Sequence, residues 1–215
     1  MVQCSWWLIM VKTILNLYGE NTYIINQKKE CYIIDPGAHI GEIKDYIETE
    51  GFTVLGVLLT HGHFDHTFSI NEVVAMYDCT VYIHKNERDF LFDPNLNLSN
   101  TLNKAITLKD KTKVSLIDKD TKLKLGYETI TVIETPGHTR GGVCYKFKRF
   151  LFSGDTLFKG TIGRYDLPTS NKTHLSNSLK LLVKVCKDNT VVYPGHGHFT
   201  TILTEKLENP FLKKS

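Results

Sequence analysis

Residues 60–66 read THGHFDH, a segment that places three histidines and one aspartate within six positions. Neutral imidazole nitrogens and carboxylate oxygens are typical ligands for Zn, Fe or Mn, and not for metals that prefer thiolates. His61 and His63 alternate along an extended segment, so both rings point to one side if the preceding strand continues through them. Asp65 and His66 follow the turn and can reach a nearby second point. The segment therefore predicts a metal site and not a polar surface turn.

Three further segments each place a possible ligand directly after an apolar strand. TPGHT, FSGDT and YPGHG contain a glycine that permits a tight turn before His138, Asp155 and His196, respectively. Loops at strand ends, held by a rigid sheet, are common places for functional sites. The seven candidate metal ligands are His61, His63, Asp65, His66, His138, Asp155 and His196.

Seven ligands are too many for one tetrahedral ion. They suit two ions about 3.5–4 Å apart that share a bridging carboxylate and a bridging hydroxide. Asp155 is the natural bridge, because a carboxylate has two oxygens whereas an imidazole offers one lone pair at a time.

Short strands with interspersed helices surround these segments. Residues 15–26 predict a hairpin around Gly19, Glu20 and Asn21, and CYIIDPG predicts a strand that ends at Pro36 and Gly37. Further strands are predicted at 54–60 and 80–84. Helices are predicted at 40–50, at 69–77 with Ser69 and Glu72 as a capping box, and at 86–93.

The second half repeats this pattern after a long loop at 93–112. Strands are predicted in KLKL, TITVIET, VCYKFK, FLFSGD and TVVYPG, with a helix over 173–186. The two halves, about 12–92 and 113–212, are not separated by a linker rich in Pro, Gly or Ser. We therefore expect one α/β domain with two sheets over 12–215, preceded by an N-terminal extension of residues 1–11.

The composition argues against several functional classes. A net charge of +3, from 26 basic and 23 acidic residues, is too small to predict nucleic-acid binding. The sequence contains no run of about 18–20 apolar residues, so no membrane span is predicted. The N-terminal residues do not resemble a signal peptide. The five cysteines are dispersed without a CxxC pair, which predicts free thiols in a reducing compartment and a cytoplasmic location.

The order of these motifs resembles a known family. The H-x-H-x-D-H segment, followed by His138, Asp155 and His196, resembles the ligand series of the metallo-β-lactamase superfamily. Within it, TPGHT, GDTLF, GTIGRYDLP and VYPGHG resemble the glyoxalase II (hydroxyacylglutathione hydrolase) group most closely. The similarity extends from about residue 12 to NPFL at 209–212. It implies an αββα four-layer sandwich, with the site at one edge between two sheets.

The resemblance also implies roles for individual residues. His61, His63 and His138 would hold one divalent ion, and Asp65, His66 and His196 a second, with Asp155 as the bridge. The ions are expected to be Zn, with Fe or Mn as alternatives. Asp65 and Asp155 would take part in catalysis, in which a bridging hydroxide attacks a glutathione thioester such as S-lactoylglutathione. Asp35 would support the metal loops, and the expected substrate contacts are Arg164, Lys159 and Tyr165.

One departure from the group leaves alternatives open. Full-length glyoxalase II enzymes carry a C-terminal helical domain that contacts glutathione, whereas this chain stops a few residues after NPFL and resembles the short single-domain form. A mononuclear iron persulfide dioxygenase, with the same motifs, is the main alternative. A lactonase, a β-lactamase or an RNA-processing nuclease shares the first motif. A non-catalytic metal-binding scaffold is the alternative from a different functional class.

Overall fold

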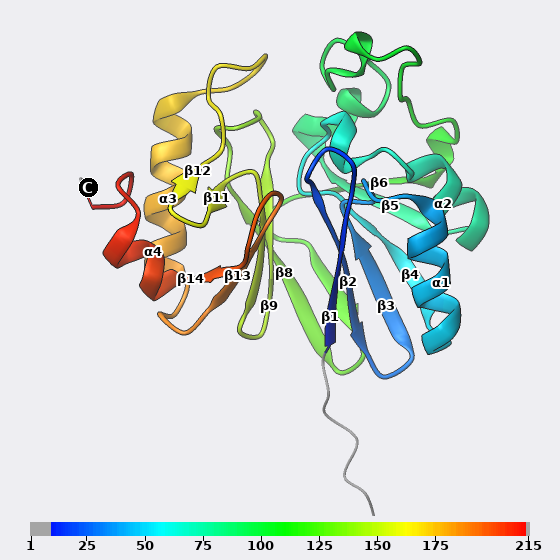
Figure 1. Cartoon of the computed structure of the whole chain (residues 1–215), viewed down its shortest axis with the longest axis horizontal. Helices are drawn as coiled ribbons and strands as arrows, with labels where there is room; N and C mark the ends of the chain where they lie inside the picture. The colour runs from blue at the N-terminus through cyan, green and yellow to red at the C-terminus, as the bar shows by residue number, and fades with distance from the viewer. Residues whose placement is uncertain (1–9, 214–215) are drawn as a thin grey trace, which may run out of the picture.

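The computed structural model describes residues 10–213 of the 215-residue chain. Two β-sheets pack face to face, and helices cover the outer face of each sheet (Figure 1). This is the αββα four-layer arrangement of the metallo-β-lactamase type that the sequence predicts.

The first sheet has the strand order β1-β2-β3-β4-β5-β6. Its strands are β1 (Met10–Leu15), β2 (Asn21–Gln27), β3 (Glu30–Ile34), β4 (Thr53–Leu58), β5 (Thr80–His84) and β6 (Val114–Ile117). Strands β1 to β3 pair antiparallel, and β3 to β6 pair parallel. Helices α1 (Ile40–Glu50) and α2 (Ile70–Tyr77) connect the parallel strands on the outer face, as right-handed crossovers require.

The second sheet has the order β14-β13-β10-β9-β8-β7. Its strands are β7 (Lys122–Leu125), β8 (Glu128–Glu134), β9 (Val143–Phe147), β10 (Phe150–Gly154), β13 (Val191–Pro194) and β14 (Thr200–Thr201). A small hairpin of β11 (Leu157–Phe158) and β12 (Thr161–Ile162) follows β10. Helices α3 (Lys172–Val185) and α4 (Ile202–Glu208) lie on the outer face.

The side chains of β2 show how one strand serves two apolar layers. Tyr23 and Ile25 pack between the sheets with Leu58 and Phe152, whereas Ile24 packs on the other face against the layer that contains Ile43. Successive side chains of a strand point to opposite faces, so a strand whose two faces are both covered buries the residues on each side. This explains why every residue of β2 is buried.

Several predicted elements agree with the structure, and some do not. The helix at 40–50 is confirmed, and Gly51 ends it in the left-handed conformation (φ 64°). The capping box is wrong, because Ser69 Oγ donates to the carbonyl oxygen of Ala38 and makes no cap bond to α2. The short helix predicted at 86–93 is present as a 3₁₀ helix, Lys85–Leu91.

The boundaries predicted for the two halves and for the N-terminal extension differ from those in the structure. Strand β6 belongs to the first sheet, so the first half extends to Ile117 and not to residue 92. Met10 and Val11, assigned to the N-terminal extension, pair with β2 in the first sheet. Residues 1–9 of that extension, including Cys4, lie outside the described residues. No helix between residues 10 and 213 is both long and apolar enough to cross a membrane.

Candidate metal centre

All seven predicted ligands meet at one edge of the two sheets. They lie on four loops: His61 to His66 follow β4, His138 follows β8, Asp155 follows β10, and His196 follows β13. Strand β4 was predicted to end at residue 60 and ends at Leu58, so His61 and His63 lie in the loop after the strand and do not alternate along it. The loop nevertheless brings the His61 and His63 rings together, with 4.7 Å between their centroids.

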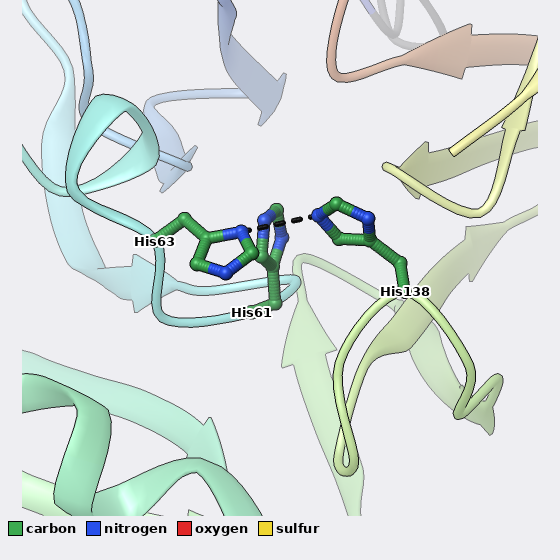
Figure 2. Close-up of side chains that lie close together, drawn as sticks. All are labelled: His61, His63 and His138. Atoms are coloured by element: carbon green, nitrogen blue, oxygen red, sulfur yellow. Dashed lines mark hydrogen bonds between the residues drawn. The ribbon is translucent and has the colours of Figure 1, made fainter. Parts of the chain in front are cut away.

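His61, His63 and His138 form the first ligand group. One nitrogen from each ring lies within 4.8 Å of the others. His63 Nδ1 and His138 Nε2 face each other at 3.1 Å, and the His61 and His138 rings are edge to face (Figure 2). All three residues are buried. Three imidazoles that converge from two sheets are a common ligand set for zinc.

Asp65, His66 and His196 form the second ligand group. His196 Nε2 is 3.3 Å from Asp65 Oδ2, and His66 Nε2 is 4.0 Å from the same oxygen. His66 is fully buried, whereas the side chains of Asp65 and His196 are 19% and 30% exposed. The centre therefore opens to solvent on the Asp65 and His196 side.

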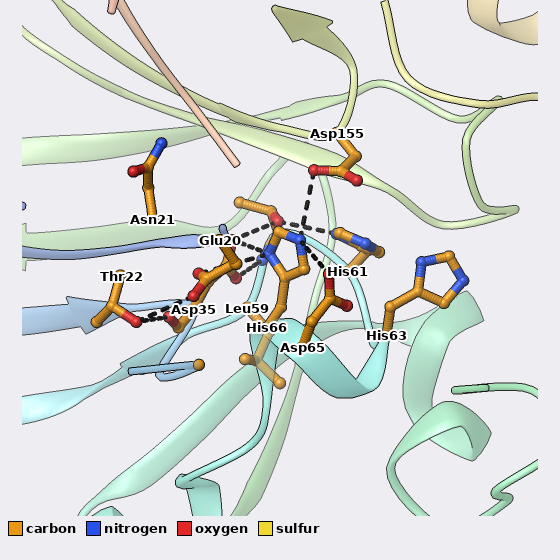
Figure 3. A network of polar contacts seen from close by, with 12 residues as sticks. Glu20, Asn21, Thr22, Asp35, Leu59, His61, His63, Asp65, His66 and Asp155 are labelled. Atoms are coloured by element: carbon orange, nitrogen blue, oxygen red, sulfur yellow. Dashed lines mark hydrogen bonds and ion pairs between the residues drawn. The ribbon is translucent and has the colours of Figure 1, made fainter. Parts of the chain in front are cut away.

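Asp155 lies between the two groups. Its Oδ1 is 3.3 Å from His66 Nε2 (Figure 3). Its Oδ2 is 3.4 Å from His138 Nε2 and 3.7 Å from His196 Nε2. The loop after β13 approaches closely because residue 195 is glycine: a Cβ there would lie 2.2 Å from Asp155 Oδ1. One carboxylate therefore faces ligands of both groups, which is the geometry required of a bridge.

The outward-facing nitrogens of four ligand histidines have partners. The Nδ1 atoms of His66, His138 and His196 lie 2.8–3.0 Å from Asp35 Oδ2 and from the carbonyl oxygens of Arg164 and Gly19. These acceptors fix the proton on Nδ1, so that Nε2 presents its lone pair inward. His61 Nδ1 lies 3.1 Å from Thr60 Oγ1, whose own proton goes to Asp35 Oδ2.

The atoms of the candidate ligands that face the interior of the centre indicate a cation-binding site. Within residues 10–213, the Nε2 atoms of His61 and His66 and the Oδ1 atom of Asp155 are buried and have no hydrogen-bond partner, and His63 turns its Nδ1 toward Nε2 of His138. An unpaired buried polar atom costs about 1–3 kcal/mol, so a fold that retains several in one place is expected to use them as ligands. The donor set of imidazoles and carboxylates fits Zn, Fe or Mn.

Protonation differs between the two ligand groups. Burial, together with the neighbouring imidazoles, lowers the pKa of His61 well below its usual range and that of His63 to about 3. Burial also opposes protonation of His66, but Asp155, Asp65 and Asp35 raise the pKa of this ring well above its ordinary value. His61 and His63 are therefore neutral and ready to bind a cation at neutral pH, whereas His66 must first release a proton.

Burial also acts on Asp155, whose carboxylate is surrounded by imidazoles. Burial alone would raise the pKa of Asp155, yet His66, His138 and His61 together lower it well below 3.8. The side chain is therefore an anion throughout the neutral range, as a bridging ligand must be.

Asp35 supports both groups from behind, as the resemblance implies. Its Oδ1 accepts from Thr60 N at 2.7 Å, and its Oδ2 accepts from Thr60 Oγ1 at 2.6 Å and from His66 Nδ1. Asp35 adopts a positive φ of 50°, a conformation that aspartate and asparagine tolerate better than most residues. The carboxylate thereby connects the strand end carrying His61 to the ring of His66.

Glu87 is a residue that the sequence analysis missed. It is fully buried on the 3₁₀ helix after β5, and its carboxylate accepts from Gly62 N at 3.1 Å and from Gly141 N at 2.8 Å. Burial raises its pKa to about 7. Gly62 lies between His61 and His63, so Glu87 ties their loop to the loop that follows His138.

The three expected substrate contacts lie in the β11–β12 turn and in the loop that follows β12. The guanidinium of Arg164 is exposed and pairs with Asp166 at 2.9 Å and 3.0 Å, while the Arg164 backbone carbonyl orients His138. Lys159 is exposed in the β11–β12 turn. Tyr165 is 38% exposed, and its ring lies 5.4 Å from Lys172 Nζ. All three remain candidates for substrate binding.

The profile of the metallo-beta-lactamase superfamily matches residues 15–196. The chain belongs to this superfamily. A probable metallo-hydrolase of Bacillus subtilis, YqgX, is 40% identical over 194 residues, which cover 89% of this chain and 92% of the relative. Membership and this relative indicate a metal-dependent hydrolase.

The solved structures that this chain resembles include two that are more than 30% identical to it. BLEG-1, a B3 metallo-beta-lactamase, is 37% identical with a TM-score of 0.88, over 94% of this chain and 99% of that one. TTHA1623 in a di-iron-bound form is 33% identical with a TM-score of 0.84, over 94% of this chain and 100% of the other. The second structure shows that a relative with this fold holds two metal ions.

Proposed function

We propose that this protein is a two-metal hydrolase of glutathione thioesters such as S-lactoylglutathione. The observation that carries the two-metal part is the position of Asp155, whose two oxygens face ligands of both groups at 3.3–3.7 Å. The thioester part rests on the resemblance of GTIGRYDLP and its neighbouring motifs to glyoxalase II.

The protein side chains have defined tasks in this scheme. Two divalent ions, held by the two ligand groups and Asp155, would supply hydroxide near neutral pH and would stabilise negative charge on the carbonyl oxygen. Asp155 and the buried imidazoles hold the centre rigid, because four of the rings are fixed through Nδ1. Asp65 and His196 border the solvent-facing side, from which the thioester carbonyl must approach.

The cysteines of the described chain are unsuited to act as nucleophiles, which favours direct attack by a water and not a covalent cysteine intermediate. Cys31, Cys79, Cys144 and Cys186 are free and buried. Burial raises the pKa of Cys31 and of Cys144 to about 12 and that of Cys79 to about 11. A nucleophilic cysteine needs a lowered pKa and access to substrate, so these thiols are structural.

Glutathione carries carboxylates, and Arg164 is the proposed partner for one of them. Its bidentate pair with Asp166 is exposed at both residues, 67% and 64%. An exposed pair of this kind contributes little stability, so a substrate carboxylate can replace Asp166 at small cost. Lys159 in the β11–β12 turn provides a further exposed cation, and Tyr165, next to Arg164 in the chain, provides a partly exposed aromatic ring.

The β-lactam ring is the second candidate substrate. The observation that favours it is the 37% identity to BLEG-1, with nearly complete coverage of both chains. Hydrolysis of a strained amide needs the same nucleophile and the same stabilisation of a developing oxyanion, so the metal centre alone does not discriminate between the two substrates.

The proposal is tested with purified protein of known metal content. We expect turnover of S-D-lactoylglutathione, with much slower hydrolysis of a chromogenic cephalosporin. An Asp155→Asn variant prepared in the same way serves as the control for the metal centre. Cephalosporin hydrolysis without thioester turnover would overturn the proposal in favour of a lactamase. Oxygen uptake with glutathione persulfide, at one iron per chain, would overturn it in favour of a dioxygenase.

A further inference from the structure

The turn between β1 and β2 contacts all three residues of the second ligand group. It contains Asn16 to Glu20, and it projects from the first sheet toward the metal loops. Asn16 Oδ1 accepts from Tyr18 N at 2.8 Å and from Glu20 N at 2.9 Å, which fixes the shape of the turn. The amide nitrogen of the same side chain points away from the turn.

That amide nitrogen binds the backbone at the first ligand. Asn16 Nδ2 donates to the carbonyl oxygen of Asp65 at 3.0 Å, to that of Gly37 at 3.2 Å and to Glu20 Oε2 at 3.1 Å. Asn16 and Asp65 are 49 positions apart, so this contact joins two distant segments of the chain. The 3₁₀ turn that carries Asp65 and His66 is thereby held from outside.

Glu20 lies behind the second ligand. Its side chain is fully buried, and its Oε1 is 3.8 Å from His66 Nδ1, next to the Asp35 carboxylate that binds the same nitrogen (Figure 3). Glu20 Oε2 accepts from Asn16 Nδ2 and from Thr22 Oγ1. Since β1 and β2 bury a carboxylic group at this position, the His66 ring is confined on the side opposite the centre.

The third ligand is held by the backbone of the turn. The carbonyl oxygen of Gly19 accepts from His196 Nδ1 at 3.0 Å, and Glu20 forms an isolated antiparallel bridge with His196. Asn21 N donates to the carbonyl oxygen of Gly195 at 2.7 Å. These contacts join the first sheet to the last loop of the second sheet.

Residue 37 shows how closely the β1–β2 turn approaches the loop that carries Asp65. A Cβ at Gly37 would lie 1.9 Å from the Asp65 carbonyl oxygen, 2.2 Å from Glu20 Oε2 and 2.7 Å from Asn16 Nδ2. Two of these three atoms belong to the turn and the third to a ligand residue. The absence of a side chain at residue 37 is therefore a condition for the turn to reach the metal loop.

We propose that the β1–β2 turn is a positioning element for the Asp65, His66 and His196 group, in which Asn16 fixes the backbone at Asp65 and Glu20 confines the ring of His66. The inference concerns metal binding and ligand orientation, so it holds whichever substrate the centre hydrolyses. Both side chains act through ligands and are positioning residues.

The first test is stepwise titration of metal-free protein with Co²⁺ or Zn²⁺. Asn16→Ser retains a hydroxyl that can bond within the turn but is too short to reach Asp65, and Glu20→Gln preserves the size of the side chain. Each variant is expected to weaken the binding of one ion by about 10–100-fold, as loss of an outer partner of a ligand typically does. The other ion should bind within about twofold of the wild type, which is the specificity that a positioning role predicts.

The matched control is Leu17→Ala, a change in the same turn at a side chain that is fully exposed. It should bind both ions as the wild type does. Wild-type affinities in Asn16→Ser and Glu20→Gln, or equal weakening of both ions, would overturn the proposal.

A second test uses no metal. Nitrogen-15 NMR of the imidazole rings should show His196 with its proton on Nδ1 in the wild type and in Leu17→Ala, because Gly19 O accepts it. Asn16→Ser should show a mixture of tautomers, because the turn no longer has a fixed position. An unchanged single tautomer in that variant would contradict a positioning role even if the chain bound only one ion.

Discussion

Replacement of Asp35 by asparagine tests how the protein prepares its ligands. The change preserves size, and asparagine tolerates the positive φ of 50° at this position. The carboxylate accepts three hydrogen bonds, from Thr60 N, Thr60 Oγ1 and His66 Nδ1, at 2.6–3.0 Å. An asparagine has only one oxygen, so its amide group must face at least one of these donors.

Either orientation of the asparagine is unfavourable. If its oxygen stays on Thr60 N, the amide group faces His66 and favours the tautomer with the proton on Nε2, which points into the metal centre. If the amide is flipped, the buried Thr60 N–H loses its acceptor. One unsatisfied buried donor costs about 1–3 kcal/mol. For a chain of this length, that corresponds to a fall in Tm of about 2–12 °C, and metal affinity should fall about 10–100-fold.

Thermal unfolding in EDTA and metal titration of the refolded protein measure the two effects separately. Asp110→Asn is the control, because Asp110 is exposed and its side chain bonds only to the nearby Thr112 among its described contacts. A Tm and a metal affinity that are unchanged in Asp35→Asn would refute the assignment of His66 Nδ1 as the donor to Asp35. They would also remove the reason to expect fixed tautomers elsewhere in the centre.

Three other perturbations give separate expectations. The raised pKa of His66 and the lowered pKa of His63, about 3, predict that acidification from pH 8 to pH 6 releases one ion before the other. A proton on His66 must leave before metal binds, so the metal affinity of the Asp65, His66 and His196 group should fall up to about tenfold per pH unit below the raised pKa of His66. Metal titrations in which the affinities for both ions fall in parallel would contradict this. Asp155→Ala should lower both bound metal and rate, as measured by elemental analysis and turnover, and full activity would exclude a shared bridge. Arg164→Ala should raise KM about two- to fivefold for an anionic thioester and leave an uncharged thioester unaffected, whereas equal effects would remove its recognition role.

Three of the candidate ligands, His138, Asp155 and His196, were predictable because each follows a strand and a glycine. A strand end is visible in the sequence as the last residue of an apolar run, and the sheets bring such ends to a common edge. This is why His138, Asp155 and His196 could be placed together although they come from three separate loops. The glycine before or beside each ligand marks the place where loops approach closely, as Gly195 does against Asp155.

The residues that hold the ligands were not predictable in the same way. Asn16 and Glu20 are polar residues in a turn, Glu87 is one in a short 3₁₀ helix, and such connecting segments are polar in most proteins. Their importance comes from partners far along the chain, such as Asp65 for Asn16 and Gly141 for Glu87. Only the folded structure brings these partners within hydrogen-bond distance.

Local patterns also failed where a tertiary contact was stronger. Ser69 and Glu72 have the spacing of a capping box, but the Ser69 hydroxyl donates to Ala38 at 2.7 Å instead. Strand β6 has four residues, of which only Ile117 is buried, so its apolar pattern is too weak to identify it. Its place in the first sheet is fixed by parallel pairing with β5.

The most direct test of the account is the rate of S-D-lactoylglutathione hydrolysis as a function of bound metal per chain. Metal-free protein is loaded in steps, and rate and metal content are measured on the same samples. The account predicts little turnover up to one ion per chain and a steep rise toward a maximum at two, because both ligand groups and the Asp155 bridge must be filled. A rate that reaches its maximum at one ion, or no turnover at two, would contradict it.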